Sequence, residues 1–367
     1  MNTLQRLHAE QGQSPWIDFI DRDLILSGRL AARVADGIRG LTSNPTIFAK
    51  AVASGQYNAL IKGAISGGQS SRQIFESIAV ADVGDAADVL RGVYDESGGT
   101  DGFVSIEVEP DLADDTAGTL ARARQLWRLV ARPNLLVKIP ATPAGLPAIE
   151  DAIAEGISIN VTLMFSVDVY RAVARAYLAG LRRRMAAGGD VRRIASVASF
   201  FVSRVDTKAD KALEAIGTQA ALALRGRAAI ANAKMAYRAY GEIFGGSEFD
   251  NLRAAGAHVQ RCLWASTSTK NPAYRDVLYA DELIGPDTVN TLPSETIAAF
   301  LDHGVVARTL DAGVDAAHAA LEAVEAQGIS MRQVTDELIA EGVAAFARSF
   351  DELLAAIDAQ REALAPA

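Results

Sequence analysis

Short apolar runs alternate along the chain with longer, Ala-rich stretches of helical spacing. This alternation is typical of the β-α units that build a parallel sheet. The apolar runs predict eight strands, at residues 16–20, 38–42, 103–108, 135–139, 158–164, 194–202, 262–266 and 288–292. Eight parallel strands close a (β/α)8 TIM barrel, although periodicity alone also fits an open, doubly wound sheet. We therefore predict an α/β fold of the barrel type.

Two helical stretches exceed what eight β-α units need. Residues 206–244 look helical throughout, with breaks near Gly217 and Gly226, and are too long for one crossover helix. We expect them to be a helical insertion in a single barrel domain that spans residues 1–367. Residues 330–363 predict a C-terminal helix with one apolar face, formed by Phe346, Phe350, Leu354 and Ile357. The pattern leaves open whether this helix covers the barrel mouth or packs on the barrel flank.

One predicted strand contains a lysine. In LLVKIP, residues 135–140, Lys138 lies within an apolar run that should be buried on both faces. Lysine is rarely buried without a function, and burial favours the neutral, nucleophilic amine. The alternative is a lysine at the end of a strand that reaches solvent.

Other polar residues interrupt the predicted strands or follow them directly. Within the strands they are Asp18, Glu107, Asn160, Thr162 and Ser199, the last alternating with Phe201. Each alone also fits a structural role, but strands of a barrel end at a common mouth, so together they indicate an active site. Arg204 and Lys270 follow two strands. They either face water or supply the positive charge that a phosphate group requires.

These residue types suit aldol chemistry through an imine. Such a reaction needs an amine nucleophile, an acid/base beside the breaking bond and a second proton shuttle. It needs no metal, because the protonated imine accepts the electrons. The four scattered histidines and the single Cys262 have no metal-ligand spacing, so we expect neither metal nor cofactor.

Composition narrows the classes of partner and compartment. The net charge of −9 argues against nonspecific nucleic-acid binding and against binding to an anionic membrane. No run of about 18 apolar residues predicts a membrane-spanning helix. The first sixteen residues lack the apolar core of a signal peptide, and the single cysteine fits a reducing compartment. We expect a cytoplasmic protein.

Several motifs, in this order, resemble the transaldolase family: TSNPTIF (42–48), SIEVEP (105–110), LLVKIPAT (135–142), INVTLMFS (159–166) and ASFFVSR (198–204). Together they extend from residue 42 to residue 204, a little under half of the chain. WASTSTKNPAY (264–274) and LIGPDTVNTLP (283–293) are similar to a longer bacterial subgroup of that family. The resemblance implies a barrel that is circularly permuted relative to other class I aldolases, with extra helices.

The resemblance also implies roles for individual residues. Lys138 corresponds to the Schiff-base lysine, and Asp18 to the acid/base that assists cleavage and formation of the carbon–carbon bond. Glu107 and Thr162 correspond to the pair that positions a water for imine chemistry. The substrate-binding residues that it implies are Asn44, Asn160, Ser199, Phe201, Arg204 and Lys270, with Arg204 as a phosphate ligand and Lys270 near the expected place of a second one.

The implied reaction belongs to the pentose phosphate pathway. A dihydroxyacetone unit passes from sedoheptulose 7-phosphate to glyceraldehyde 3-phosphate, giving erythrose 4-phosphate and fructose 6-phosphate. One alternative is a lyase similar to fructose-6-phosphate aldolase, which uses the same lysine but has glutamine and tyrosine in place of Glu107 and Phe201. Another is a barrel without catalytic activity. The expected partners are sugar phosphates, and the protein is expected to be a monomer or a homodimer.

Overall fold

The computed structural model describes residues 1–364. Within them, seven parallel strands form one curved sheet in the order β1-β7-β6-β5-β4-β3-β2. The strands are β1 (Gln13–Ile17), β2 (Val104–Glu107), β3 (Leu135–Pro140), β4 (Ile159–Met164), β5 (Ser196–Phe201), β6 (Gln260–Ala265) and β7 (Thr288–Leu292).

Residues 39–42 close the ring between β1 and β2. Leu41 forms single parallel bridges with Ile17 on one side and with Val104 on the other. Its backbone N–H donates to the Phe103 carbonyl at 2.9 Å, and its carbonyl accepts from the Ser105 N–H at 3.1 Å. Eight consecutive segments of the chain therefore surround a common axis, which confirms the predicted α/β barrel.

Two predicted strand positions were wrong in detail. The segment predicted at 38–42 forms regular bridges only at Leu41, although Arg39 N–H donates to the Pro15 carbonyl at 2.8 Å and Thr42 N–H to the Ile17 carbonyl at 3.0 Å. A Cβ atom on Gly40 would lie only 2.4 Å from Cε2 of Trp16, so the indole ring occupies the space that a side chain would need. The first strand covers residues 13–17 rather than 16–20, so Asp18 lies directly after β1 and not within it.

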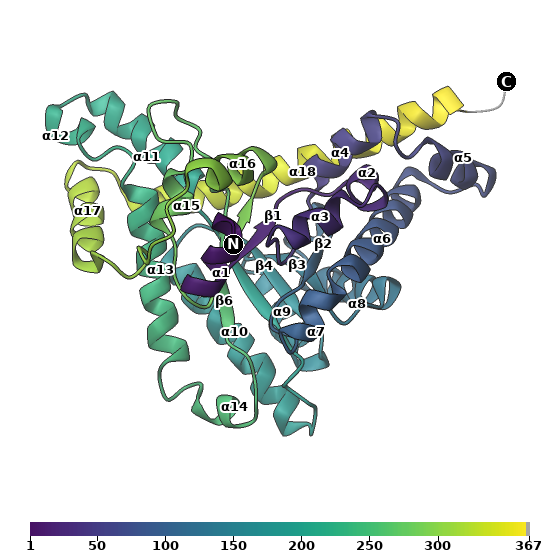
Figure 1. The fold of residues 1–367 in the computed structure, drawn as a ribbon, viewed down its shortest axis with the longest axis horizontal. Coiled ribbons are helices and arrows are strands. Elements are labelled where there is room, and N and C mark those ends of the chain that lie inside the picture. Colours follow the sequence, from purple (N-terminus) through teal and green to yellow (C-terminus); the bar gives the residue numbers. More distant parts are fainter. Residues whose placement is uncertain (365–367) are drawn as a thin grey trace.

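Helices surround the strands of the barrel (Figure 1). They are α1 (Thr3–Gln11), α2 (Arg22–Leu26), α3 (Arg29–Ala35), α4 (Pro45–Ala53), α5 (Asn58–Ser66), α6 (Ser71–Val89), α7 (Arg91–Glu96), the 3-10 helix η1 (Pro110–Leu112), α8 (Thr116–Val130), α9 (Gly145–Glu155), α10 (Val167–Ala186), α11 (Ser203–Ile216), α12 (Gln219–Leu222), α13 (Ala228–Phe244), α14 (Asp250–Ala254), α15 (Leu278–Glu282), α16 (Ser294–His303), α17 (Val314–Ala326) and α18 (Met331–Leu364).

The two predicted extra helical stretches, residues 206–244 and the C-terminal helix, lie in different parts of the structure. Residues 206–244 lie in α11, α12 and α13, with breaks at Gly217 and Gly226, both of which have positive φ. Helix α18 begins after Ser330, whose hydroxyl accepts a hydrogen bond from the Gln333 N–H at 3.2 Å. It runs in yellow from the side of α11 to the side of α4 and packs against both (Figure 1).

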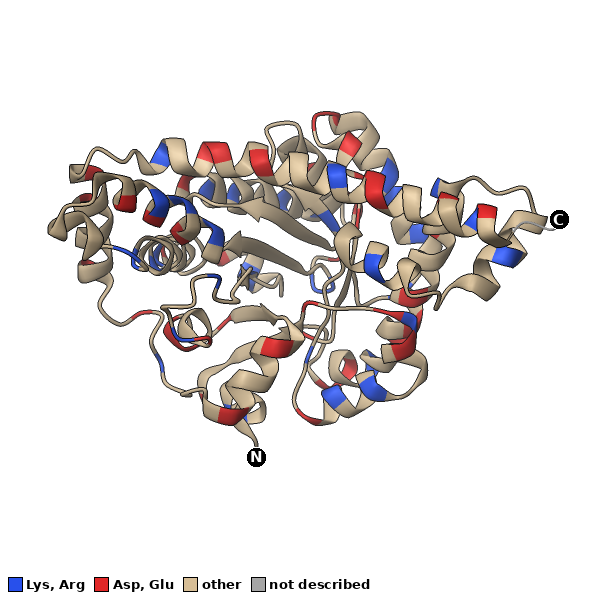
Figure 2. Cartoon of the chain, turned by 90° about the horizontal axis from the view of Figure 1, so that it is seen from above, with Lys and Arg blue, Asp and Glu red and all other residues tan. Residues whose placement is uncertain are grey.

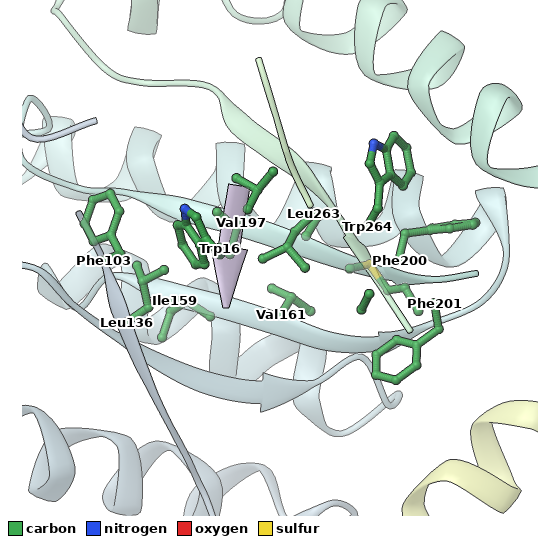
Figure 3. Packing of buried hydrophobic residues seen from close by; sticks show 14 of the residues in the cluster. Trp16, Phe103, Leu136, Ile159, Val161, Val197, Phe200, Phe201, Leu263 and Trp264 are labelled. Atoms are coloured by element: carbon green, nitrogen blue, oxygen red, sulfur yellow. The ribbon is translucent and has the colours of Figure 1, made fainter. Parts of the chain in front are cut away.

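The barrel interior is filled by side chains that alternate along the strands. Trp16, Leu136, Val197 and Leu263 belong to the buried cluster shown in Figure 3. Acidic and basic residues are interspersed over the surrounding helices (Figure 2). No helix among residues 1–364 is long and apolar enough to cross a membrane.

A charged cluster lies at the opposite end of the barrel from the strand carboxyl ends. The Asp101 carboxylate accepts from Arg39 Nε at 2.8 Å and from Trp16 Nε1 at 3.0 Å, bonds Ser14, and lies 3.4 Å from Arg261. Burial alone would raise the pKa of Asp101, but the Arg261 and Arg39 charges and the Ser14 hydroxyl outweigh it and lower that pKa. The carboxylate therefore stays ionised inside the protein.

Candidate active site

A cavity of ≈ 600 Å³ opens at the carboxyl ends of the strands. This end of a (β/α)8 barrel is where active sites are built. Residues within or directly after seven of the eight barrel segments line the cavity, as do residues of α4, α11, α16 and α18. Those that the sequence singled out are Asp18, Asn44, Lys138, Thr162, Ser199, Phe201, Arg204 and Lys270.

Lys138 lies on the floor of the cavity. Its side chain is only 7% exposed, and Nζ donates to Glu107 Oε2 at 3.3 Å and to the Ser43 carbonyl at 3.4 Å. Glu107 and Asn160 are the register partners of Lys138 on the two adjacent strands, so all three side chains face the barrel interior. Burial raises the pKa of Glu107, although the Lys138 charge opposes this shift. The arrangement gives a buried amine a carboxyl group that readily exchanges a proton.

Asp18 lies beside the lysine, directly after β1. One of its carboxylate oxygens accepts from the Thr42 hydroxyl at 2.8 Å, and that hydroxyl is 2.9 Å from the Thr291 hydroxyl. Burial raises the Asp18 pKa, while the Lys138 charge, the Thr42 hydrogen bond and the Arg204 charge act against the rise. A carboxyl group with a raised pKa is suited to general acid/base catalysis near neutral pH.

Polar groups on β4 and β5 continue the cavity wall. The Thr162 hydroxyl is buried and has no hydrogen-bond partner among residues 1–364, although it lines the cavity. Buried hydroxyls are normally paired, so this one is available to a water or substrate group. Ser199 Oγ donates to Asn160 Oδ1 at 2.7 Å, and Asn160 Nδ2 donates to Ser105 Oγ at 3.0 Å.

The cavity wall also carries the Asn44 amide and two basic groups, Arg204 and Lys270. Asn44 is the N-cap of α4: its Oδ1 accepts from the Ile47 N–H at 3.1 Å, which leaves the amide nitrogen for the cavity. The Arg204 guanidinium, on the first turn of α11, lies 5.2 Å from the centre of the Phe201 ring. Burial lowers the pKa of Arg204. Lys270 also lines the cavity, and its Nζ donates to Ser268 Oγ at 2.6 Å.

Two of the predicted residues are not on the cavity surface. Glu107 and Asn160 are absent from its lining and lie one layer deeper, behind Lys138 and Ser199. The Asn160 side-chain amide accepts a hydrogen bond from Ser199 and donates one of its two N–H groups to Ser105, so these two side chains hold it behind the cavity surface.

Several residues of the cavity were missed by sequence reasoning. Thr42 lies within the TSNPTIF motif but gave no sign that it holds Asp18. Lys50 and Glu295 lie on exposed helical surfaces, as many charged residues do, and line the rim. Phe346 was identified only as part of an apolar helix face, yet its ring lies 5.6 Å from Lys138 Nζ.

Comparison with known proteins agrees with this geometry. Residues 15–357 match the family described as "Transaldolase/Fructose-6-phosphate aldolase". The chain is 53% identical to "Transaldolase 1" of Streptomyces coelicolor over 96% of its own length and 93% of that protein. It is 51% identical to "Transaldolase" of Thermobifida fusca, with 96% of each chain covered, and 46% identical to "Transaldolase 2" of a Nostoc species, with 97% of each covered. The chain therefore belongs to the transaldolase/fructose-6-phosphate aldolase family.

Proposed function

We propose that this enzyme transfers a dihydroxyacetone unit from sedoheptulose 7-phosphate to glyceraldehyde 3-phosphate through a Schiff base on Lys138. The products are erythrose 4-phosphate and fructose 6-phosphate, a step of the pentose phosphate pathway in the cytoplasm. The observation that carries the proposal is the buried Lys138 amine, 3.3 Å from the Glu107 carboxylate on the floor of a cavity that Asp18 also lines. Relatives named transaldolase at about half identity over nearly the whole chain support it.

In the first half of the reaction, the imine forms and the C3–C4 bond of the ketose phosphate is cleaved. The neutral Lys138 amine adds to C2 of the ketose phosphate, and the carbinolamine loses water. Glu107 carries the protons of these two steps, with the water held between Glu107 and the Thr162 hydroxyl. Asp18 then takes the proton of the C4 hydroxyl, the C3–C4 bond breaks and the aldose phosphate leaves. Lys138 is left with the three-carbon unit as an enamine.

The second half runs the same steps in reverse with another aldehyde. C3 of the enamine attacks the aldehyde carbon, and Asp18 returns the proton to the new hydroxyl. Water then adds to C2 of the new ketose, and the C2–N bond breaks. Because the iminium is itself the electron sink, the residues named here account for every proton and electron that moves.

The remaining cavity residues bind and orient the substrate. In the proposed complex, Asn44, Ser199 and Asn160 hold hydroxyl groups of the dihydroxyacetone end. Arg204 and Lys270 bind the terminal phosphate, for which a guanidinium fork offers paired hydrogen bonds.

Two groups favour transfer over release: Glu107, behind Lys138, and Phe201, on the cavity wall. Glu107 is a carboxyl group that shuttles protons, which an amide at this position does not do. Phe201 offers no hydroxyl that would help water to release the three-carbon unit. The test compares fructose 6-phosphate cleavage with and without erythrose 4-phosphate. We expect turnover to depend on the aldehyde acceptor, and cleavage at full rate without acceptor would make the enzyme a lyase.

A further inference from the structure

Helix α18 is not part of any β-α unit of the ring, yet it supplies a side chain to the cavity. Phe346, near its middle, lines the cavity, and the centre of its ring lies 5.6 Å from Lys138 Nζ. This is within cation–π distance of the amine that forms the proposed imine. The sequence left open whether the C-terminal helix covers the mouth, and the position of Phe346 shows that part of it does.

A glycine brings this helix close to the barrel. Gly342 faces β4, and a Cβ atom added to it would lie 3.0 Å from Leu163 Cδ2. Leu163 has a φ of +61° at a shift in the β4–β5 register, directly after Thr162. Because residues four apart lie on the same face of a helix, Phe346 projects in the direction that Gly342 faces, one turn further on. The close approach at Gly342 therefore sets the depth of the Phe346 ring.

The helix is tied down on both sides of the cavity. On one side, Lys208 of α11 contacts Glu337 at 2.7 Å and Glu341 at 2.5 Å. On the other side, Thr46 of α4 donates to Ser349 Oγ at 2.8 Å. Helix α11 carries Arg204 and α4 begins at Asn44, so α18 spans the mouth between the two walls of the cavity (Figure 1).

We propose that Phe346 is a specificity-determining residue that keeps water and proton donors away from the enamine on Lys138, so that transfer wins over release. This inference rests on the proposed function. Phe346 and Phe201 are two of the aromatic side chains that line the cavity, and they come from two separate elements, α18 and β5. Such shielding matters in the interval after the first aldose leaves and before the second aldehyde arrives, when the cavity is open to solvent.

The two fates of the enamine differ in what C3 receives. In transfer, the C3 electron pair forms a bond to the aldehyde carbon. In release, C3 takes a proton, water adds to C2 of the resulting iminium, and the C2–N bond breaks to give free dihydroxyacetone and the lysine amine. The water consumed balances the water lost when the imine formed. Release therefore begins with a proton delivered to C3. Removing the phenyl ring in Phe346→Ala leaves room for roughly three waters of about 30 Å³ each to deliver that proton.

The test measures a partition ratio in the full-length enzyme. Free dihydroxyacetone formed from fructose 6-phosphate alone is divided by the rate of transfer to erythrose 4-phosphate. Phe346→Ala opens the wall, Phe346→Leu keeps it apolar without an aromatic ring, and Leu354→Ala disturbs the same helix away from the cavity. Circular dichroism and thermal melts check folding, and Phe346→Val replaces the alanine variant if that variant does not fold.

We expect Phe346→Ala to raise the ratio by about tenfold, a barrier difference near 1.4 kcal/mol, while the other two variants stay within about twofold of wild type. A wild-type ratio in Phe346→Ala would overturn the inference. An equal rise in Phe346→Leu would assign the effect to the aromatic ring rather than to exclusion of water, and an equal rise in Leu354→Ala would assign it to loosening of the helix. Absence of transfer by the wild type would instead refute the proposed function.

Discussion

Arg204 offers the sharpest test of how the cavity recognises phosphate. It lies on the cavity wall, its guanidinium is 5.2 Å from the Phe201 ring centre, and no ion pair to it occurs among residues 1–364. Burial without a bound counter-charge is unfavourable, and it lowers the pKa of this arginine. A substrate phosphate would supply that charge. The loss on removing Arg204 should therefore appear only with phosphorylated substrates.

The magnitude follows from the contacts that a guanidinium offers. A hydrogen bond between charged partners contributes about 1.5–3 kcal/mol. A bidentate pair in a cavity open to solvent should then contribute about 3 kcal/mol, or roughly 150-fold in kcat/KM. Arg204→Ala should lose that factor for fructose 6-phosphate. Arg204→Lys, which keeps the charge but not the fork, should lose about tenfold.

Steady-state kinetics with matched donors measure this effect. Fructose 6-phosphate is compared with unphosphorylated fructose, each with erythrose 4-phosphate as acceptor under saturating conditions, so that only the donor phosphate differs. Arg225→Ala is the control, because Arg225 is exposed and bound to Glu214 at 2.7 Å. An equal loss of kcat/KM for both donors in Arg204→Ala would refute the reasoning, since it would show that Arg204 serves the packing of Phe201 rather than the phosphate.

Three other changes have defined outcomes. Asp101→Asn leaves two arginines without a counter-charge and should lower the free energy of unfolding by about 3 kcal/mol in urea denaturation. Burial raises the Asp101 pKa, but the Arg261 and Arg39 charges and the Ser14 hydrogen bond together lower it more, so its folded pKa is below the unfolded one. Asp101 therefore stabilises the wild type fully at pH values above the unfolded pKa, and this stabilisation is lost as the pH falls through the folded pKa. A wild type that stays more stable than Asp101→Asn below the folded pKa would contradict this assignment. Glu107→Gln should lower kcat by about 10²–10⁴ with little change in KM, because an amide carries no proton; an unchanged kcat would remove Glu107 from the mechanism. Gly40→Ala, whose Cβ would meet the Trp16 ring at 2.4 Å, should lower the melting temperature, and an unchanged melt would show that the indole moves freely.

The fold was accessible from the sequence because each buried strand is a short apolar run between helical stretches. The exceptions have local causes. Residues 13–15, Gln-Ser-Pro, are polar or strand-breaking residue types and were not predicted as a strand. Gln13 and Ser14 nevertheless begin β1, where their side chains are buried and hydrogen-bonded. Residues 38–42 were predicted as a strand. The segment forms regular bridges only at Leu41, although Arg39 and Thr42 also donate backbone hydrogen bonds to the β1 segment.

The candidate site was accessible for a different reason. A lysine or acid inside an apolar strand is conspicuous, so Lys138 and Glu107 stood out. Residues whose partners lie far away in the chain could not be identified from the sequence. Asp101 lies in a glycine-rich loop, where an acid is ordinary, and its partner Arg261 is 160 residues away. Phe346 resembles any apolar residue of a helix, and only the path of α18 across the mouth brings it to Lys138. Periodicity carries no information about such distant pairs.

The central claim is that Lys138 forms a Schiff base with the ketose substrate. The most direct measurement is mass spectrometry of the intact protein after treatment with fructose 6-phosphate and borohydride, followed by peptide mapping. We expect a single covalent adduct derived from the ketose, on Lys138, and no adduct in a folded Lys138→Ala variant. Equal labelling of that variant, or turnover by a wild-type enzyme that never becomes labelled, would contradict the account.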